Sequence, residues 1–157
     1  MAVAEHLMKL EGDWIAVNRL WMMPGDPPLE SESVAVVALA ANRKFLHIAY
    51  TWEHDGQQEG LLLIGKASNT AEVTAAWVDS WHNGDRVMHC KGEVTAEGEF
   101  SARGSYPAPS GPDWGWRIVI QADADPDHWT LVMYNITPDD EEQLAVEARF
   151  TRVSDDD

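Results

Sequence analysis

The sequence has few basic residues, a single cysteine and no long apolar run. Its 157 residues contain 11 Lys and Arg against 27 Asp and Glu, giving a formal net charge of −16 at pH 7. Nucleic acids and anionic membrane surfaces are bound through clusters of Lys and Arg, so we expect neither as a partner. No apolar run approaches the roughly 20 residues of a membrane span. Residues 1–9 lack the basic and apolar regions of a signal peptide, which predicts a cytoplasmic protein.

Residues for metal, nucleotide or nucleophilic chemistry are also sparse. Cys90 alone excludes an internal disulfide, and we expect a buried, inert thiol, since the adjacent His89 points to the other face of a strand. The histidines form no His-x-His pair, so we predict no metal site and no cofactor. His47 and His82 stand on predicted strands and, like His89, would be the candidates if the protein bound haem. Glycine-rich phosphate loops and a Gly-x-Ser-x-Gly elbow are absent, and no catalytic residue is assigned.

Apolar residues alternate with a period of two along most of the chain, and turn residues recur between the alternating segments, which predicts strands. A short helix is expected at Ala4–Leu10, before Gly12. The dipeptide Asn83-Gly84 predicts a tight hairpin between the fifth and sixth strands. The predicted strands are Trp14–Met23, Glu32–Ala41, Phe45–His54, Glu59–Lys66, Glu72–His82, Arg86–Thr95, Gly98–Ser105, Trp114–Ala122, His128–Ile136 and Glu142–Val153.

About ten antiparallel strands with short connections favour a sheet that closes on itself, because closure removes the open edges. We therefore predict an all-β fold: a closed, antiparallel, up-and-down barrel with a short N-terminal helix. No linker or repeat divides the chain, so residues 1–157 are expected to form one domain with an acidic tail at 154–157. A barrel of this size can hold one small ligand inside.

The segment Gly12-Asp13-Trp14 resembles the Gly-x-Trp start of the calycins, which include lipocalins and fatty-acid-binding proteins. The resemblance implies that Trp14 plugs the closed end of the barrel and that an arginine of the last strand stacks on it, either Arg152 or Arg149. Five further segments together look like the bacterial family called domain of unknown function 1579, which implies a lipocalin-like barrel and no established reaction. These segments are Trp77–His82, Gly104–Pro107, Trp114–Arg117, Met133–Pro138 and Phe150–Arg152.

The fifth predicted strand has the densest group of candidate binding residues. Alternation places Trp77, Asp79 and Trp81 on one face, opposite Ser80 and His82. A carboxylate between two indoles needs hydrogen-bond partners. Asp79 therefore either orients a ligand or acts as a base on a cavity wall, or it stabilises the barrel; with the opposite register, Ser80 and His82 would face the ligand. Further wall candidates are Trp116, Trp129 and Met133, with Arg117 as an alternative orienting group.

These patterns favour a barrel that binds a small hydrophobic or aromatic molecule in its interior. Two alternatives stay open: an enzyme that uses Asp79 or His82 as acid or base, and a non-catalytic oligomeric module with a filled barrel. The ninth strand is apolar on both faces, which predicts a homodimer formed through the outside of the barrel. The proline-rich loops Pro24–Pro28 and Tyr106–Asp113 would form a portal if both lie at the open end.

Overall fold

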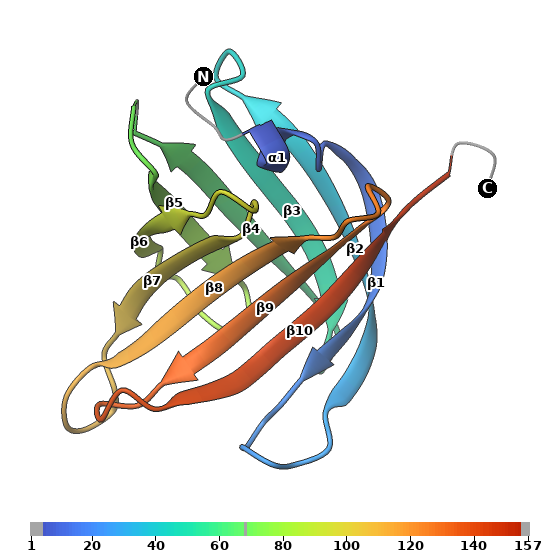
Figure 1. Ribbon diagram of the computed structural model, residues 1–157. Coiled ribbons are helices and arrows are strands. Elements are labelled where there is room, and N and C mark those ends of the chain that lie inside the picture. Colours follow the sequence, from blue (N-terminus) through green and yellow to red (C-terminus); the bar gives the residue numbers. More distant parts are fainter. Residues whose placement is uncertain (1–4, 68, 155–157) are drawn as a thin grey trace.

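Ten antiparallel strands form a closed barrel in the computed structural model, which describes residues 5–67 and 69–154. Each strand pairs with its neighbours in sequence, and β1 pairs with β10 to complete the ring (Figure 1). The short helix α1 lies across one end of the barrel. The elements are α1 (Glu5–Met8), β1 (Gly12–Leu20), β2 (Leu29–Ala40), β3 (Phe45–Glu53), β4 (Gln57–Lys66), β5 (Glu72–Asp79), β6 (Met88–Val94), β7 (Phe100–Tyr106), β8 (Trp114–Ala122), β9 (His128–Ile136) and β10 (Glu142–Arg152).

This architecture confirms the predicted all-β, up-and-down barrel with a short N-terminal helix. The bounds of β8 and β9 coincide with the predicted ones, and most other strands differ by one to three residues at an end. The fifth strand is the informative exception, because it ends at Asp79 instead of His82. β5 and β6 pair as the predicted antiparallel hairpin, but residues 80–87 connect them, so the connection that contains Asn83-Gly84 is longer than predicted. Ala4 of the predicted helix and residues 155–157 of the acidic tail lie outside the described residues.

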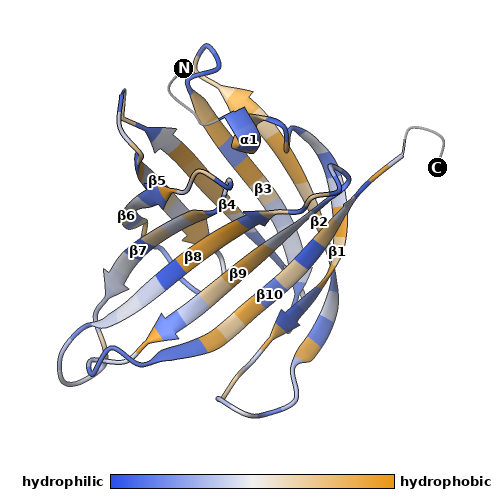
Figure 2. Ribbon diagram, viewed as in Figure 1, coloured by the Kyte–Doolittle hydropathy of each residue, from blue (hydrophilic) through white to orange (hydrophobic). Residues whose placement is uncertain are grey.

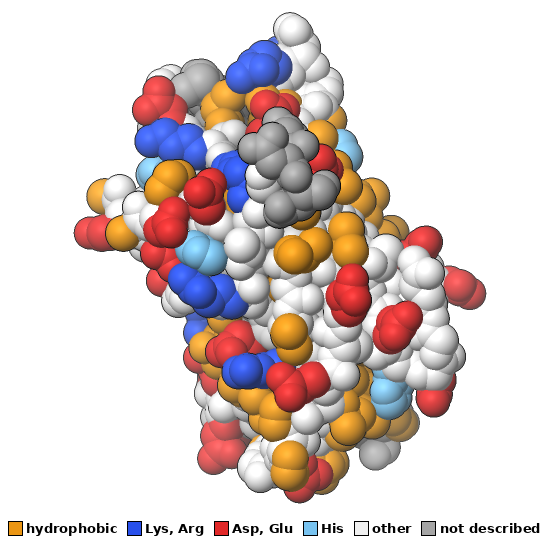
Figure 3. Space-filling model, turned by 90° about the vertical axis from the view of Figure 1, so that its right-hand side faces the viewer, with side chains coloured by type: hydrophobic (Ala, Val, Ile, Leu, Met, Phe, Trp, Pro, Cys, Tyr) orange, Lys and Arg blue, Asp and Glu red, His pale blue; other side chains and the backbone are white. Residues whose placement is uncertain are grey.

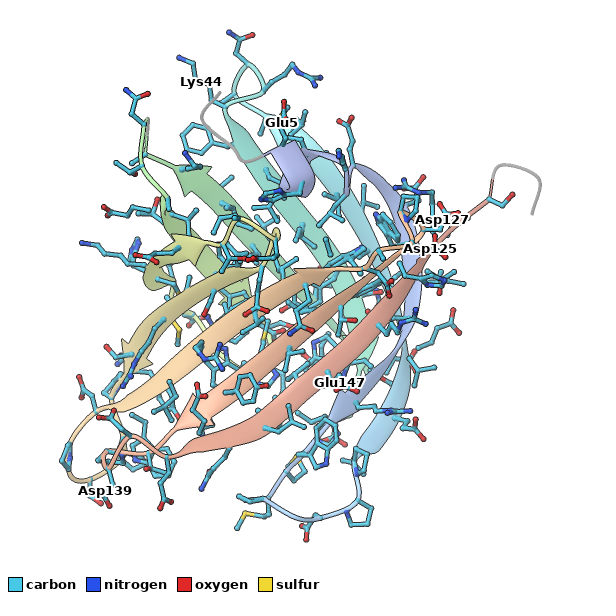
Figure 4. All side chains as sticks on the ribbon, viewed as in Figure 1. Glu5, Lys44, Asp125, Asp127, Asp139 and Glu147 are labelled. Carbon is cyan, nitrogen blue, oxygen red and sulfur yellow. The ribbon has the colours of Figure 1, made fainter. Side chains whose placement is uncertain are left out.

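The barrel interior is apolar because inward and outward side chains alternate along each strand. On β3, for example, Leu46, Ile48, Tyr50 and Trp52 are buried. Figure 2 shows this alternation as orange and blue bands along the ribbons. The labelled acidic side chains in Figure 4, among them Glu147 on β10, point away from the barrel. The negative charge therefore lies on the outside and in the connections.

The position of Cys90 agrees with the sequence prediction. Cys90 is buried, and burial raises the pKa of its thiol to about 11, which keeps it protonated at neutral pH. Among the described residues, no helix is long and apolar enough to cross a bilayer.

The end of the barrel near α1 is closed by Trp14 and Arg152. The Trp14 ring is fully buried, and its Nε1 donates a hydrogen bond of 2.8 Å to the carbonyl of Leu10. The Arg152 guanidinium lies 4.3 Å from the centre of this ring and donates to the carbonyls of Lys9, Glu11 and Pro126. The choice of Arg152 as stacking partner is confirmed. Arg149 instead pairs with Asp123 on the surface.

Steric constraints explain why the first residue of the Gly-x-Trp motif is a glycine. Gly12 has a φ of 139°, a region that side chains disfavour. A Cβ at this position would lie 2.6 Å from a guanidinium nitrogen of Arg152. The glycine therefore leaves room for the arginine that covers Trp14.

The outer surface carries an apolar patch, but away from the ninth strand. Val132 on β9 is 6% exposed, and the neighbouring Tyr134 ring is covered by the Arg117 guanidinium at 4.6 Å. The exposed apolar side chains belong mainly to β1, β2 and β4, and Figure 3 shows hydrophobic side chains between acidic ones on this side of the barrel. We define the outer apolar patch as Ile15, Val34, Val36, Leu61 and Leu63.

We expect Arg152→Ala to lower the free energy of unfolding by about 2–3 kcal/mol, because it removes charge-assisted hydrogen bonds and a cation–π contact. Arg149→Ala is the matched control: it breaks an exposed ion pair and should cost less than about 1 kcal/mol. Urea denaturation monitored by tryptophan fluorescence measures both. Equal costs for the two variants would contradict the closing role of Arg152.

Candidate functional site

A cavity of about 520 Å³ opens at the end of the barrel opposite α1. The β5–β6 loop, residues 80–87, and the start of the β7–β8 loop, residues 107–113, form its rim. The β1–β2 loop lies at the same end of the barrel (Figure 1), but of the two proline-rich segments, Pro24–Pro28 and Tyr106–Asp113, only Tyr106 and Pro107 line the cavity among the described residues. The full lining is Trp77, Trp81, His82, Asn83, Arg86, Val87, Met88, Ser105, Tyr106, Pro107 and Trp116.

Asp79 organises the chain beneath this cavity. The residue is 2% exposed, and each of its carboxylate oxygens accepts two hydrogen bonds. Oδ1 accepts from the backbone N–H groups of Trp81 at 2.9 Å and His82 at 3.0 Å. Oδ2 accepts from the Tyr50 hydroxyl at 2.7 Å and from Trp52 Nε1 at 3.1 Å. The two backbone contacts turn the chain away from the sheet, which explains why β5 ends at Asp79.

Tyr50 extends this network across the barrel. Its hydroxyl donates to Asp79 and accepts a hydrogen bond of 2.9 Å from Trp77 Nε1. Burial, reinforced by the negative charge of Asp79, raises the pKa of Tyr50 well above 10, so the phenol remains a donor. Gly60 on β4 makes space for the phenol ring, because a Cβ there would lie 2.1 Å from Tyr50 Cζ.

The turn after Asp79 places the His82 imidazole among four indole rings. The ring-centre distances are 5.4 Å to Trp52, 5.7 Å to Trp77, 4.8 Å to Trp81 and 5.3 Å to Trp116. Burial in this cage lowers the pKa of His82 to about 4, and the Asp79 carboxylate opposes the shift only partly. The imidazole is therefore neutral at physiological pH. We call these five rings the aromatic cage.

The buried rings of Trp77 and Trp116 form an inner aromatic wall of the cavity. Their rings stack with centres 5.3 Å apart and planes 11° from parallel. Trp81 lies at the rim and is 37% exposed. Tyr106 is held from β7 by a hydrogen bond that its hydroxyl donates to Asn135 on β9. These contacts fix the orientation of the aromatic surface before any ligand arrives.

Two of the described residues that line the cavity carry buried polar atoms without a hydrogen-bond partner. Within the described part of the chain, Nε1 of Trp116 and Oδ1 of Asn83 are buried without a hydrogen-bond partner. A buried polar atom without a partner costs about 1–3 kcal/mol, which a suitably placed ligand group would recover. Arg86 is the one charged side chain among the described lining residues.

Deeper in the barrel, a second cavity has a volume of about 10 Å³. Asn18, Ser33, Tyr50, Asp79 and His82 contribute polar atoms to its lining. This volume is close to that of a single water molecule. The interior below the aromatic cage is thus packed, and the space for a ligand lies at the mouth.

The six predicted ligand-binding residues lie at different positions along the barrel axis. Trp77, Trp81 and Trp116 line the mouth cavity, whereas Asp79 and Met133 line the small inner cavity. Trp129 packs near the closed end, 6.0 Å from Trp14 and 4.5 Å from Phe150 between ring centres.

Two predictions about side-chain direction differ from the structure. Trp81 and His82 do not follow strand alternation, because the chain has already turned. Arg117, the expected orienting group, lies outside the barrel and pairs with Glu142.

Sequence reasoning missed several residues of the site. Arg86, predicted to begin the sixth strand, lies with Asn83 in the loop before it. Alternation along the third strand does not show that Tyr50 and Trp52 meet Asp79. Among the described residues, no group of three or more His, Cys, Asp or Glu side chains is arranged to hold a metal ion.

Comparisons with known proteins agree with this barrel. A family model described as "Protein of unknown function (DUF1579)" matches residues 2–152. The solved structure of Rv2717c from M. tuberculosis is similar, with 16% identity, a TM-score of 0.58, and coverage of 97% of this chain and 99% of that one. The S-type phycobiliprotein lyase CPES from Guillardia theta is also similar, with 13% identity, a TM-score of 0.60 and coverage of 98% and 94%. No curated protein matches the sequence.

The buried, neutral His82 predicts a specific loss of stability in acid. Folding lowers its pKa from 6.5 to about 4. Between pH 6.5 and pH 4 the imidazole is therefore protonated in the unfolded chain but neutral in the folded chain. The stability that neutral His82 contributes is complete above about pH 6.5 and is lost as the pH falls towards 4. We expect the wild type to lose roughly 3 kcal/mol more than His82→Phe over this range, from about 1.4 kcal/mol per pKa unit.

Urea denaturation at a series of pH values measures this difference. His89→Phe, at an exposed position of β6, serves as control and should keep the acid dependence of the wild type. If His82→Phe loses stability as steeply as the wild type, the ring is not held neutral by burial.

Proposed function

The chain belongs to the family described as "Protein of unknown function (DUF1579)", as its motifs indicated, and because this description names no activity, we propose a function from the cavity itself. The protein binds a small, largely aromatic molecule at the mouth of its barrel. The observation that carries this proposal is a cavity of about 520 Å³ whose inner wall is the stacked pair Trp77 and Trp116 and whose rim carries the 37% exposed ring of Trp81. The sequence placed the ligand deeper in the interior, where the indoles leave little room.

The binding energy would come mainly from apolar burial, at about 25 cal/mol per Å² of surface removed from water. The indole faces favour a planar ligand, since aromatic rings gain further energy from stacked or edge-on contacts. Trp116 Nε1 and Asn83 Oδ1 add one donor and one acceptor without partners among the described residues. Likeness to a phycobiliprotein lyase supports the shared barrel, and the proposal of a ligand rests on the cavity.

In this proposal Asp79 supports the site from below. Its carboxylate holds the backbone of Trp81 and His82 and the side chains of Tyr50 and Trp52. Met133 and Trp129 act through packing, at the inner cavity and at the closed end. The ligand would contact Trp81 and Trp116.

We expect Trp81→Ala to weaken binding of the neutral dye N-phenyl-1-naphthylamine about tenfold, because loss of one aromatic contact costs roughly 1–1.5 kcal/mol. Trp81 is partly exposed at the rim, so the variant should still fold. Trp21→Ala is the matched control, since Trp21 does not line the cavity. Fluorescence titration gives the dissociation constants. Equal affinities of wild type and Trp81→Ala would place the dye elsewhere.

A second proposal concerns the oligomeric state: we infer that two copies associate through the outer apolar patch. Ile15 is directly opposite Val34, and Val36 is aligned through Ala49 with Leu61, so the patch is continuous across four strands. Its five members are uncharged, and the exposed Asp13, which pairs with Val36, lies beside them on β1. A two-fold axis would bring the same patch of both copies together.

We expect Val34→Lys to convert the dimer to a monomer, because Val34 pairs with the uncharged Ile15 and Thr51, so a charge at this position of the patch would be buried without a partner. Met23→Lys is the control: it places a lysine at another exposed apolar side chain, in the β1–β2 loop. Sedimentation equilibrium gives the mass of each variant. A monomeric wild type at its highest soluble concentration would contradict the proposed dimer.

A further inference from the structure

The charges around the mouth cavity differ from those of the whole protein. The chain has 27 acidic and 11 basic residues, yet no Asp or Glu is among the described residues that line the cavity. Arg86 supplies a positive charge there, and His82 is neutral because burial lowers its pKa to about 4. The described lining of the cavity thus carries one positively charged side chain and no negatively charged one.

Arg86 also differs from most other arginines of the chain. Arg19, Arg103, Arg117, Arg149 and Arg152 each form an ion pair with an acidic side chain. For Arg86, no carboxylate lies within ion-pair distance among the described residues, although acidic side chains outnumber basic ones more than twofold.

The position of Arg86 is fixed by the loop that carries it. Its backbone N–H donates a hydrogen bond of 3.1 Å to the carbonyl of Asn83. Asn83 Nδ2 in turn donates a hydrogen bond of 2.9 Å to the carbonyl of Trp77, and the backbone N–H of Asn83 donates one of 3.0 Å to the carbonyl of Asp79. The loop therefore connects the guanidinium at the rim to the aromatic surface inside the cavity.

From this geometry we propose that the ligand is a planar aromatic anion: its rings pack in the mouth cavity beside Trp81 and Trp116, and its carboxylate or sulfonate pairs with Arg86. This assignment rests on the proposed function of the same cavity. A guanidinium presents parallel N–H donors to two oxygens of one anionic group, which gives orientation as well as affinity. A neutral aromatic ligand would leave this cation unpaired.

Two dyes that differ by a single sulfonate distinguish pairing of an anionic group with Arg86 from binding of the aromatic rings in the cavity. 1-Anilinonaphthalene-8-sulfonate is the anion, and N-phenyl-1-naphthylamine is its neutral counterpart. We expect Arg86→Gln to weaken binding of the sulfonate dye about tenfold, because one charge-assisted contact is lost. The affinity for the neutral dye should change less than about twofold. Arg86→Lys should recover part of the affinity, because it keeps the charge and loses the paired donors.

Arg43→Gln is the matched control, since Arg43 lies in the β2–β3 turn, at the opposite end of the barrel. Added salt should weaken binding of the sulfonate dye to the wild type more than binding to Arg86→Gln, because salt screens the ion pair.

The outcomes separate the two proposals. If neither dye binds the wild type, the proposed function is wrong. If both dyes bind and Arg86→Gln affects them equally or not at all, the cavity binds aromatic molecules but the assignment of an anion is overturned.

Discussion

The open end of the barrel depends on a single buried carboxylate. Asp79 accepts four hydrogen bonds, two from side chains of β3 and two from the backbone just beyond β5. An ionised carboxylate can be buried at tolerable cost only when such donors replace its hydration. The two hydrogen bonds from the backbone to Asp79 end β5 and turn the following loop inwards, which places the His82 ring between the indoles. One electrostatic requirement therefore sets strand length, loop direction and the shape of the mouth cavity.

The barrel itself could be predicted because its determinants are local. Alternation along β3 identifies a strand and its buried face, and Gly- or Asp-rich turns separate the strands. Trp14 and Arg152 could be paired in advance because the Gly-x-Trp segment resembles a known arrangement, and the structure adds the physical reason: Gly12 leaves space for the guanidinium.

The site was less predictable because its determinants are not local. Alternation tells which face of a strand a residue occupies, but not how far along the barrel axis it lies. Trp116 and Trp129 are both buried, yet one lines the mouth and the other packs beside Trp14. The contact between Tyr50 and Asp79 spans 29 positions and requires the register of three strands, as well as Gly60 opposite Tyr50. Arg86, in a loop, has no pattern to reveal it.

Net charge and local charge have different consequences for a ligand at this mouth. The acidic side chains lie on the outer surface and in the connections, where solvent and salt screen them beyond a Debye length of about 8–10 Å. Asp79 is closer, but its charge is already compensated by four donors. The guanidinium of Arg86 at the cavity rim acts over hydrogen-bond distances, where screening is weak. A chain with a net charge of −16 can for this reason still favour an anion at one site, and its acidic exterior would exclude polyanions while admitting a small one.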